Sequence, residues 1–230
     1  MATLFQSTES QAPPLGLLLR EVRQIANWRR VASPAPLVEA VGQGRPVLVI
    51  PGFLASDGST RPLRQALRQA GFSARGWGQG RNFGLRGDVL GAIDMRVREM
   101  EAHHGGPVSI VGWSLGGLIA REYAKIEPDR VDRVVTLGSP FSGSLRSNNA
   151  WRLYELVARH KIDEPPIACD IKAKPPVETI AIWSRRDGVI AAACARGLPG
   201  ERDRAIEVGC GHIEMSFAPE AQRAVITALA

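Results

Sequence analysis

The feature that most constrains the fold of this chain is an apolar run that leads directly into a Gly-x-Ser-x-Gly turn. Residues 108–111 read Val-Ser-Ile-Val, residues 112–116 read Gly-Trp-Ser-Leu-Gly, and residues 118–125 follow as a helical pattern. This order predicts a buried strand, a sharp turn and a helix. Such a turn lifts the hydroxyl of Ser114 off the end of a sheet and leaves the helix N-terminus beneath it, so Ser114 is a candidate nucleophile.

The Gly-x-Ser-x-Gly pattern carries little weight without this context. A chain of this length and composition contains it by chance roughly 0.15 times, and the alternative is an ordinary strand-to-helix turn with an incidental serine. The neighbouring glycines favour the first interpretation. Gly112, Gly116 and Gly117 let the backbone approach other elements closely and relieve strain at the serine.

From about residue 45 the chain alternates short apolar runs with helical patterns. We expect strands at residues 47–50, 72–76, 108–111, 131–137, 179–183 and 205–208, and helices at 61–70, 89–103 and 220–229. This alternation predicts a parallel sheet covered by helices on both faces, in one domain over residues 34–230. It lapses over residues 139–176, which hold one expected helix at 150–160 and form a candidate cap over the sheet's carboxyl edge.

Residues 1–33 precede this domain as a polar, proline-containing tail and an amphipathic helix over 15–30. Leu15, Leu18, Val22 and Ile25 share one face of that helix. One interpretation is a helix packed on the domain. The other is a basic interfacial helix that makes weak contact with a membrane surface.

Composition excludes several classes of protein. The net charge is +6, but the arginines are scattered without the aromatic interleaving of single-strand binders, so we expect no nucleic-acid partner. No apolar stretch approaches the ~20 residues that span a bilayer, and residues 1–14 do not resemble a signal peptide, which predicts a cytoplasmic protein. Oligomeric state is not predicted.

The three cysteines are Cys169, Cys194 and Cys210, and their spacing fits no zinc site. We expect no metal. Buried free thiols are one interpretation of these residues, and a Cys169–Cys194 pair is the alternative.

A base for the serine is expected at His212. It lies in a glycine-rich loop after the last expected strand, where a parallel sheet presents its chemistry. His103 and His104 are expected to end a helix on the far side of the sheet, and His160 to lie in the cap. The alternative for His212 is a surface-loop histidine.

Asp187 directly follows the strand expected at 179–183 and could orient the His212 imidazole and stabilise its charged form. The alternative is a simple turn aspartate.

An oxyanion would need two N–H donors. We expect the backbone N–H of Leu115, at the start of the helix, and that of Phe53, in the loop after the first strand, with Leu54 as second choice.

Together these segments resemble the α/β-hydrolase family, specifically its small lipase and esterase members. The resemblance rests on residues 49–53, 112–117, 136–140, 184–189 and 211–212, and on the chain order Ser, Asp, His. It implies a mostly parallel eight-stranded central sheet flanked by helices, from which this chain could lack one or two of the first, antiparallel strands. It also implies hydrolysis of a small-molecule ester or lipid through an acyl-enzyme, without a metal or organic cofactor.

The resulting hypothesis is a serine hydrolase that cleaves carboxylic esters through Ser114, His212 and Asp187. A thioesterase, an amidase and an acyltransferase would use the same triad, and a non-catalytic binding protein on a hydrolase scaffold is the alternative of another class. Several apolar residues are candidates for the substrate pocket, and for each the alternative is a plain core position: Leu54, Trp113, Phe141, Leu145, Trp151 and Ile213.

Overall fold

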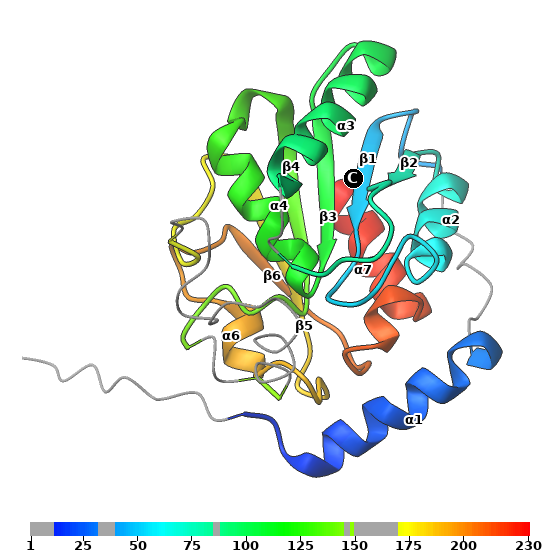
Figure 1. Cartoon of the computed structure of the whole chain (residues 1–230), viewed down its shortest axis with the longest axis vertical. Coiled ribbons are helices and arrows are strands. Elements are labelled where there is room, and N and C mark those ends of the chain that lie inside the picture. The colour runs from blue at the N-terminus through cyan, green and yellow to red at the C-terminus, as the bar shows by residue number, and fades with distance from the viewer. Residues whose placement is uncertain (1–11, 32–39, 85–87, 145–147, 150–169) are drawn as a thin grey trace, which may run out of the picture.

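The chain folds around a six-stranded sheet in which all strands are parallel (Figure 1). The computed structural model describes residues 12–31, 40–84, 88–144, 148–149 and 170–230. The strand order is β2-β1-β3-β4-β5-β6. The strands are β1 Pro46–Ile50, β2 Ser73–Gly76, β3 Val108–Trp113, β4 Val131–Leu137, β5 Glu178–Trp183 and β6 Arg204–Glu207.

Helices cover both faces of the sheet, as the alternating sequence pattern predicts. The α-helices are α1 Leu15–Val31, α2 Arg61–Gln69, α3 Val89–His104, α4 Leu115–Ile126, α6 Ala192–Arg196 and α7 Pro219–Leu229, and the 3-10 helices are η1 Pro128–Arg130 and η2 Glu214–Ser216. Alternate residues of one strand enter different cores. Leu48 packs with α3 and α4, whereas Val49 packs with α2 and α7.

The sheet has its topological switch point between β1 and β3. The chain runs from β1 outward to β2 and then returns to the other side of β1 as β3. In an open parallel sheet the crevice beyond the carboxyl ends of such a pair is where ligands bind. The loop after β1 and the turn after β3, which contains Ser114, therefore meet at this crevice.

The sheet differs from the eight strands that the resemblance implies. Neither antiparallel strand is present among the described residues, so β2 is an edge strand. Arginine side chains donate hydrogen bonds to backbone carbonyl groups of this edge strand. Arg68 Nε donates to the carbonyl of Ala74 at 3.0 Å, and Arg96 Nε donates to that of Gly76 at 3.3 Å. Charged side chains of this kind protect an edge strand from pairing with another chain.

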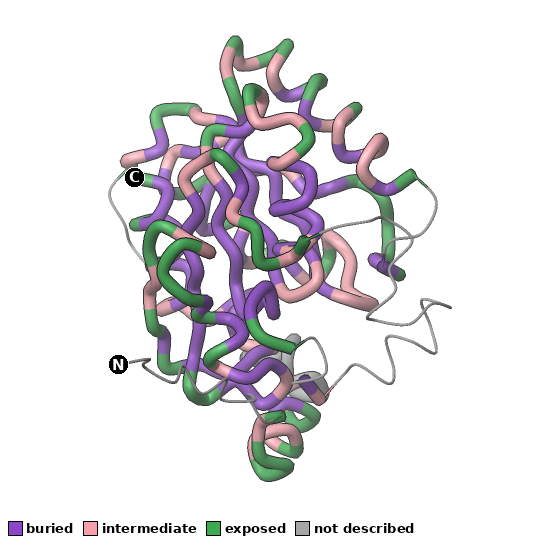
Figure 2. Tube along the Cα trace, turned by 90° about the vertical axis from the view of Figure 1, so that its left-hand side faces the viewer, coloured by how far each residue is buried: buried purple, intermediate pink, exposed green. Residues whose placement is uncertain are grey.

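Helix α1 lies across the end of the sheet toward which the strands point (Figure 1). Figure 2 shows that buried residues follow the sheet, whereas α1, at the bottom of the view, is largely exposed or half-buried. Of the expected apolar face, Leu15 and Val22 are exposed and Leu18 is half-buried, while the side chain of Ile25 is not among those described. Leu15, Leu19 and Val22 are 72%, 65% and 58% exposed, and the buried residue among residues 15–24 of the helix is Glu21.

Some predictions fall outside the described residues. They concern the helix expected at 150–160, most of the candidate cap, His160, Leu145, Trp151 and Cys169. Cys194 and Cys210 are both buried free thiols, so the alternative of a disulfide at Cys194 is wrong. None of the helices in the described ranges is long and apolar enough to cross a membrane.

Candidate active site

Ser114 occupies a strained position between β3 and α4. Its φ of 55° and ψ of −122° lie where side-chain-bearing residues are rarely found. The tight turn depends on two neighbouring glycines. A Cβ at Gly112 would overlap the backbone of Gly116, and one at Gly116 would overlap the carbonyl of Ile50. The strain is held by packing on both sides, as a nucleophile elbow requires.

The backbone around Ser114 is fixed by hydrogen bonds. The Ser114 N–H donates to the Leu137 carbonyl at 2.7 Å, and the Gly117 N–H donates to the Ser114 carbonyl at 3.0 Å. Leu115 is the first residue of α4, where backbone N–H groups have no partner within the helix and the helix dipole favours negative charge. The Leu115 N–H therefore stays the predicted first donor to an oxyanion.

Asp187 and His212 lie together at the carboxyl edge of the sheet, as predicted. His212 Nδ1 is 2.8 Å from Asp187 Oδ2, and both side chains are almost completely buried. The other carboxylate oxygen, Oδ1, accepts the N–H groups of Val189 at 2.8 Å and Ile190 at 2.7 Å. The carboxylate is therefore anchored on one oxygen and holds the imidazole with the other.

The His212 loop is also tied to the residue that precedes the nucleophile. Trp113 Nε1 donates to the His212 carbonyl at 3.1 Å, and the two rings lie 5.8 Å apart between centroids. Gly138, at the end of β4, makes room beneath the pair, since a Cβ there would lie 3.0 Å from both Asp187 Oδ2 and His212 Nδ1.

The electrostatics of this site favour a charged imidazole. Burial lowers the pKa of His212, but the charge and hydrogen bond of Asp187 and the charge of Glu21 outweigh it, so the pKa is raised above 6.5. A base with such a pKa accepts a proton readily and is stabilised in its protonated form.

The loop after β1 is braced by the glycine-rich loop after β2. Asn82 is fully buried, donates through Nδ2 to the Pro51 carbonyl at 2.8 Å, and accepts the Leu54 N–H on its backbone carbonyl at 2.7 Å. The Leu54 N–H is therefore already used, which removes the second choice for an oxyanion donor. Phe53 continues as the proposed donor of this loop.

The expected pocket residues fall into different environments. Phe141 is fully buried with the Arg121 guanidinium 4.2 Å from its ring centroid, so it is a core residue rather than an accessible wall. Trp113 is also buried, in the core beside His212. Leu54 and Ile213 are half-buried next to the catalytic loops and continue as candidates.

Sequence reasoning missed two buried residues that hydrogen-bond to the loops of the site, Asn82 and Glu21. Asn82 stands in a glycine-rich loop that the sequence shows without indicating its target. Glu21 contacts the His212 loop from a helix 191 residues earlier in the chain, so no local pattern could have revealed it. In the part of the chain that the structure describes, no cluster of three or more His, Cys, Asp or Glu could hold a metal ion.

The parallel sheet, the elbow and the paired Asp187 and His212 together define an α/β-hydrolase. The model of the family described as having the alpha/beta hydrolase fold matches residues 45–163, just over half of the chain. The chain belongs to this family.

The sequence identity to individual relatives is low. The chain is 27% identical over 128 residues to a pimeloyl-[acyl-carrier protein] methyl ester esterase of Nitrosospira multiformis, a match that covers 53% of this chain and 49% of the relative. It thus spans about half the length of that curated relative.

Two solved structures share the fold. The first comes from work on LipS and LipT, two metagenome-derived lipolytic enzymes, with a TM-score of 0.60, 16% identity, and coverage of 85% of this chain and 97% of that one. The second is a thioesterase domain from the curacin biosynthetic pathway, with a TM-score of 0.55, 12% identity, and coverage of 83% and 92%.

Proposed function

We propose that this protein is a serine hydrolase that cleaves carboxylic esters through an acyl-enzyme. The observation that carries the proposal is the 2.8 Å contact between His212 Nδ1 and Asp187 Oδ2, at the same sheet edge as a serine held at a φ of 55°. The 27% identity to a methyl ester esterase supports an ester as substrate. Family membership alone would allow several reactions of the same triad.

In the proposed reaction Ser114 Oγ attacks the ester carbonyl carbon while His212 accepts its proton. The backbone N–H groups of Leu115 and Phe53 hold the resulting oxyanion. The C–O bond then breaks, and His212 returns the proton to the leaving alcohol. Water repeats the sequence on the acyl-enzyme, which releases the carboxylic acid and restores Ser114.

The test is hydrolysis of p-nitrophenyl esters from acetate to palmitate, beside a matched thioester and a matched anilide. We expect the oxygen esters to react fastest and Ser114→Ala to lower kcat/KM at least about a thousandfold. A faster thioester would move the assignment to a thioesterase, the second use of this triad. No hydrolysis of any substrate by the folded protein would favour a transferase or a binding protein.

We also propose that the exposed apolar face of α1 contacts the surface of aggregated ester or lipid. Leu15, Leu19 and Val22 are spaced by four and three residues, so they share one face of the helix. Their helix, α1, lies at the end of the sheet toward which the strands point (Figure 1). An amphipathic helix of this kind lies in an interface rather than across it.

A cytoplasmic location is proposed too, and the free thiols of Cys194 and Cys210 fit a reducing compartment.

A further inference from the structure

Among residues 15–24 of α1, whose side chains the structure describes, the buried residue is a carboxylate that faces the active site. Glu21 is only 2% exposed, although glutamate is almost never fully buried unless it is paired. Its oxygens accept three backbone N–H groups. Oε1 accepts those of His212 at 2.6 Å and Gly188 at 3.0 Å, and Oε2 accepts that of Ile213 at 2.9 Å.

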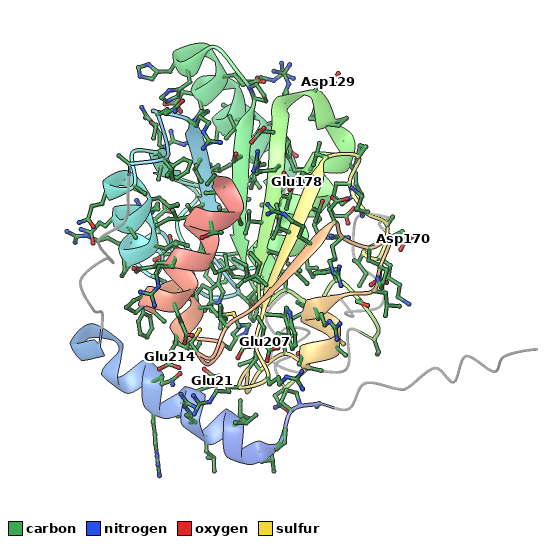
Figure 3. The ribbon with its side chains drawn as sticks, turned by 180° about the vertical axis from the view of Figure 1, so that it is seen from behind. Glu21, Asp129, Asp170, Glu178, Glu207 and Glu214 are labelled. Carbon is green, nitrogen blue, oxygen red and sulfur yellow. The ribbon has the colours of Figure 1, made fainter. Side chains whose placement is uncertain are left out.

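The three donors belong to the two loops that carry the acid and the base. Gly188 follows Asp187 directly, and His212 and Ile213 form the start of the turn into η2. One carboxylate therefore spans both loops. Figure 3 shows Glu21 and Glu214 side by side where α1 meets the catalytic end of the molecule.

The surroundings of Glu21 are built for close approach. A Cβ at Gly188 would come within 2.5 Å of the Leu17 carbonyl, and one at Gly211 would lie 2.7 Å from Glu21 Oε1. A second contact holds the helix in place, because Arg20 pairs with Glu214 at 3.3 Å while Glu214 accepts the Gly211 N–H at 2.7 Å. The helix thus meets both catalytic loops at glycines.

From this geometry we propose that Glu21 is a positioning residue, which clamps the Asp187 and His212 loops together from the N-terminal helix. The inference rests on the proposed function for its kinetic consequences. Glu21 lies before residue 45, outside the stretch that matches the family model. Charge-assisted hydrogen bonds to backbone N–H groups are among the stronger ones in proteins, so three of them can fix two loops in register.

The clamp also contributes electrostatically to the base. The charge of Glu21 acts with Asp187 to raise the pKa of His212. Several other charged groups adjoin the same loop: Glu214 on the Gly211 N–H, Arg20 on Glu214, Glu220 on the Gly209 N–H, and Arg186 on the Gly209 carbonyl. Two groups raise the pKa of His212. One is its hydrogen-bond partner Asp187, and the other is Glu21, which acts through its charge.

Two substitutions separate position from charge. Glu21→Gln retains one carbonyl oxygen but places an NH₂ group against a backbone N–H and removes the charge. We expect kcat on a soluble ester to fall about 10- to 100-fold with KM nearly unchanged, because small displacements of catalytic groups have costs of this size. The acid limb of the pH profile should move to lower pH. Glu21→Asp keeps the charge but is too short to span both loops, so kcat should fall while the acid limb stays.

The matched control is Arg23→Gln, a change of charge of equal size and opposite sign at an exposed position of the same helix. It should leave kcat, KM and the pH profile as in the wild type. If the Glu21→Gln protein is folded, as shown by a cooperative thermal transition, and keeps the wild-type kcat, the proposal is overturned. A fall in kcat with no movement of the acid limb would overturn it too, since that is the signature of a merely structural residue.

An NMR titration of the His212 imidazole keeps the test independent of the ester reaction. We expect its midpoint to be lower in Glu21→Gln than in the wild type and unchanged in Arg23→Gln. If the wild type hydrolyses no ester and the midpoint still moves as expected, the clamp stands and the proposed function fails. If the midpoint does not move in Glu21→Gln, the clamp is wrong whatever the activity.

Discussion

At the scale of the residue, the site depends on how Asp187 divides its two oxygens. Oδ1 is saturated by the N–H groups of Val189 and Ile190, which leaves Oδ2 for the His212 imidazole. This arrangement fixes Nδ1 as the protonated nitrogen of the neutral ring and leaves Nε2 without a proton, as the proposed reaction requires. Reactivity therefore depends on one hydrogen bond whose geometry is set by backbone groups.

Replacing Asp187 with asparagine should test this division. The amide can keep the backbone contacts, but it cannot stabilise an imidazolium, so we expect kcat to fall by roughly 10⁴. Steady-state kinetics on a soluble ester would check it, with circular dichroism to confirm the fold. A loss of less than about tenfold would mean that Asp187 does not orient the base.

The raised pKa of His212 sets the pH dependence of the wild type. Protonated His212 cannot act as a base, so kcat/KM should rise with pH through the pKa of this group in the free enzyme. Because that pKa is raised, the midpoint of the acid limb should lie above 6.5. A profile of kcat/KM from pH 5 to 9 would check it, and a midpoint below 6.5 would contradict the assignment of the base.

The glycines of the elbow should be intolerant of any side chain. Gly112→Ala would place a methyl group inside the backbone of α4, and we expect the free energy of unfolding to fall by at least about 2 kcal/mol. Urea denaturation measures this. Gly106→Ala is the matched control, because nothing lies within 4 Å of its added Cβ and stability should barely change.

At the scale of the element, two loops from different strands are joined beside the proposed oxyanion site. The loop after β1 is held by Asn82, whose Nδ2 donates to the Pro51 carbonyl while its Oδ1 accepts the Gly84 N–H at 3.0 Å. The buried amide links the two loops at the switch point of the sheet. The proposed second oxyanion donor, Phe53, lies in the loop that Asn82 holds in place.

Asn82→Ala should loosen this loop and leave the Pro51 carbonyl without its partner. We expect kcat to fall about 10- to 100-fold and the free energy of unfolding to fall by about 1–3 kcal/mol. Kinetics and urea melts of the variant would check both. Gln79→Ala, at an exposed position of the same glycine-rich loop, should change neither. Equal effects of the two substitutions would contradict a specific role for Asn82.

The elements themselves were predictable because their signals are local. Apolar runs and helical periodicity gave six strands whose observed bounds, such as β4 Val131–Leu137, agree within one or two residues. Short α6 was missed, since five residues are too few to show a helical period. His212 and Asp187 could be predicted because each follows a strand end. Glu21 could not, because its partners lie in the tertiary structure.

The same reason explains the error at Phe141. It follows a strand, as a pocket residue could, but Arg121 comes from α4 and covers the ring. The direction of α1 was also beyond the sequence. Periodicity identifies an apolar face, and the face with the most apolar residues normally packs inward, but here a buried carboxylate decides the orientation.

At the scale of the whole molecule, the two roles proposed for α1 meet at one end of the fold. The inner side of this helix holds the catalytic loops through Glu21, and its outer side exposes Leu15, Leu19 and Val22. Binding to an interface would therefore act on the same helix that positions the triad. A deletion of the N-terminal segment would remove both, so only substitutions on the outer side can separate them.

The combined change of Leu15, Leu19 and Val22 to serine should reveal the interfacial role. Activity on emulsified long-chain ester should fall at least about tenfold, because each large apolar side chain buried in an interface contributes about 1.5–3 kcal/mol. Activity on a soluble short-chain ester should stay near the wild-type value. Parallel assays on the emulsified ester and the soluble ester would give the ratio of the two activities. An equal loss on both would contradict surface binding.

The measurement that tests the central claim most directly is trapping of the acyl-enzyme. Rapid acid quench of the protein during turnover of a p-nitrophenyl ester, followed by intact mass and peptide mapping, reports which residue carries the acyl group. We predict one acyl group per chain, on the peptide that contains Ser114, and none in Ser114→Ala. An acyl group on another residue, or turnover that persists in Ser114→Ala, would contradict the account.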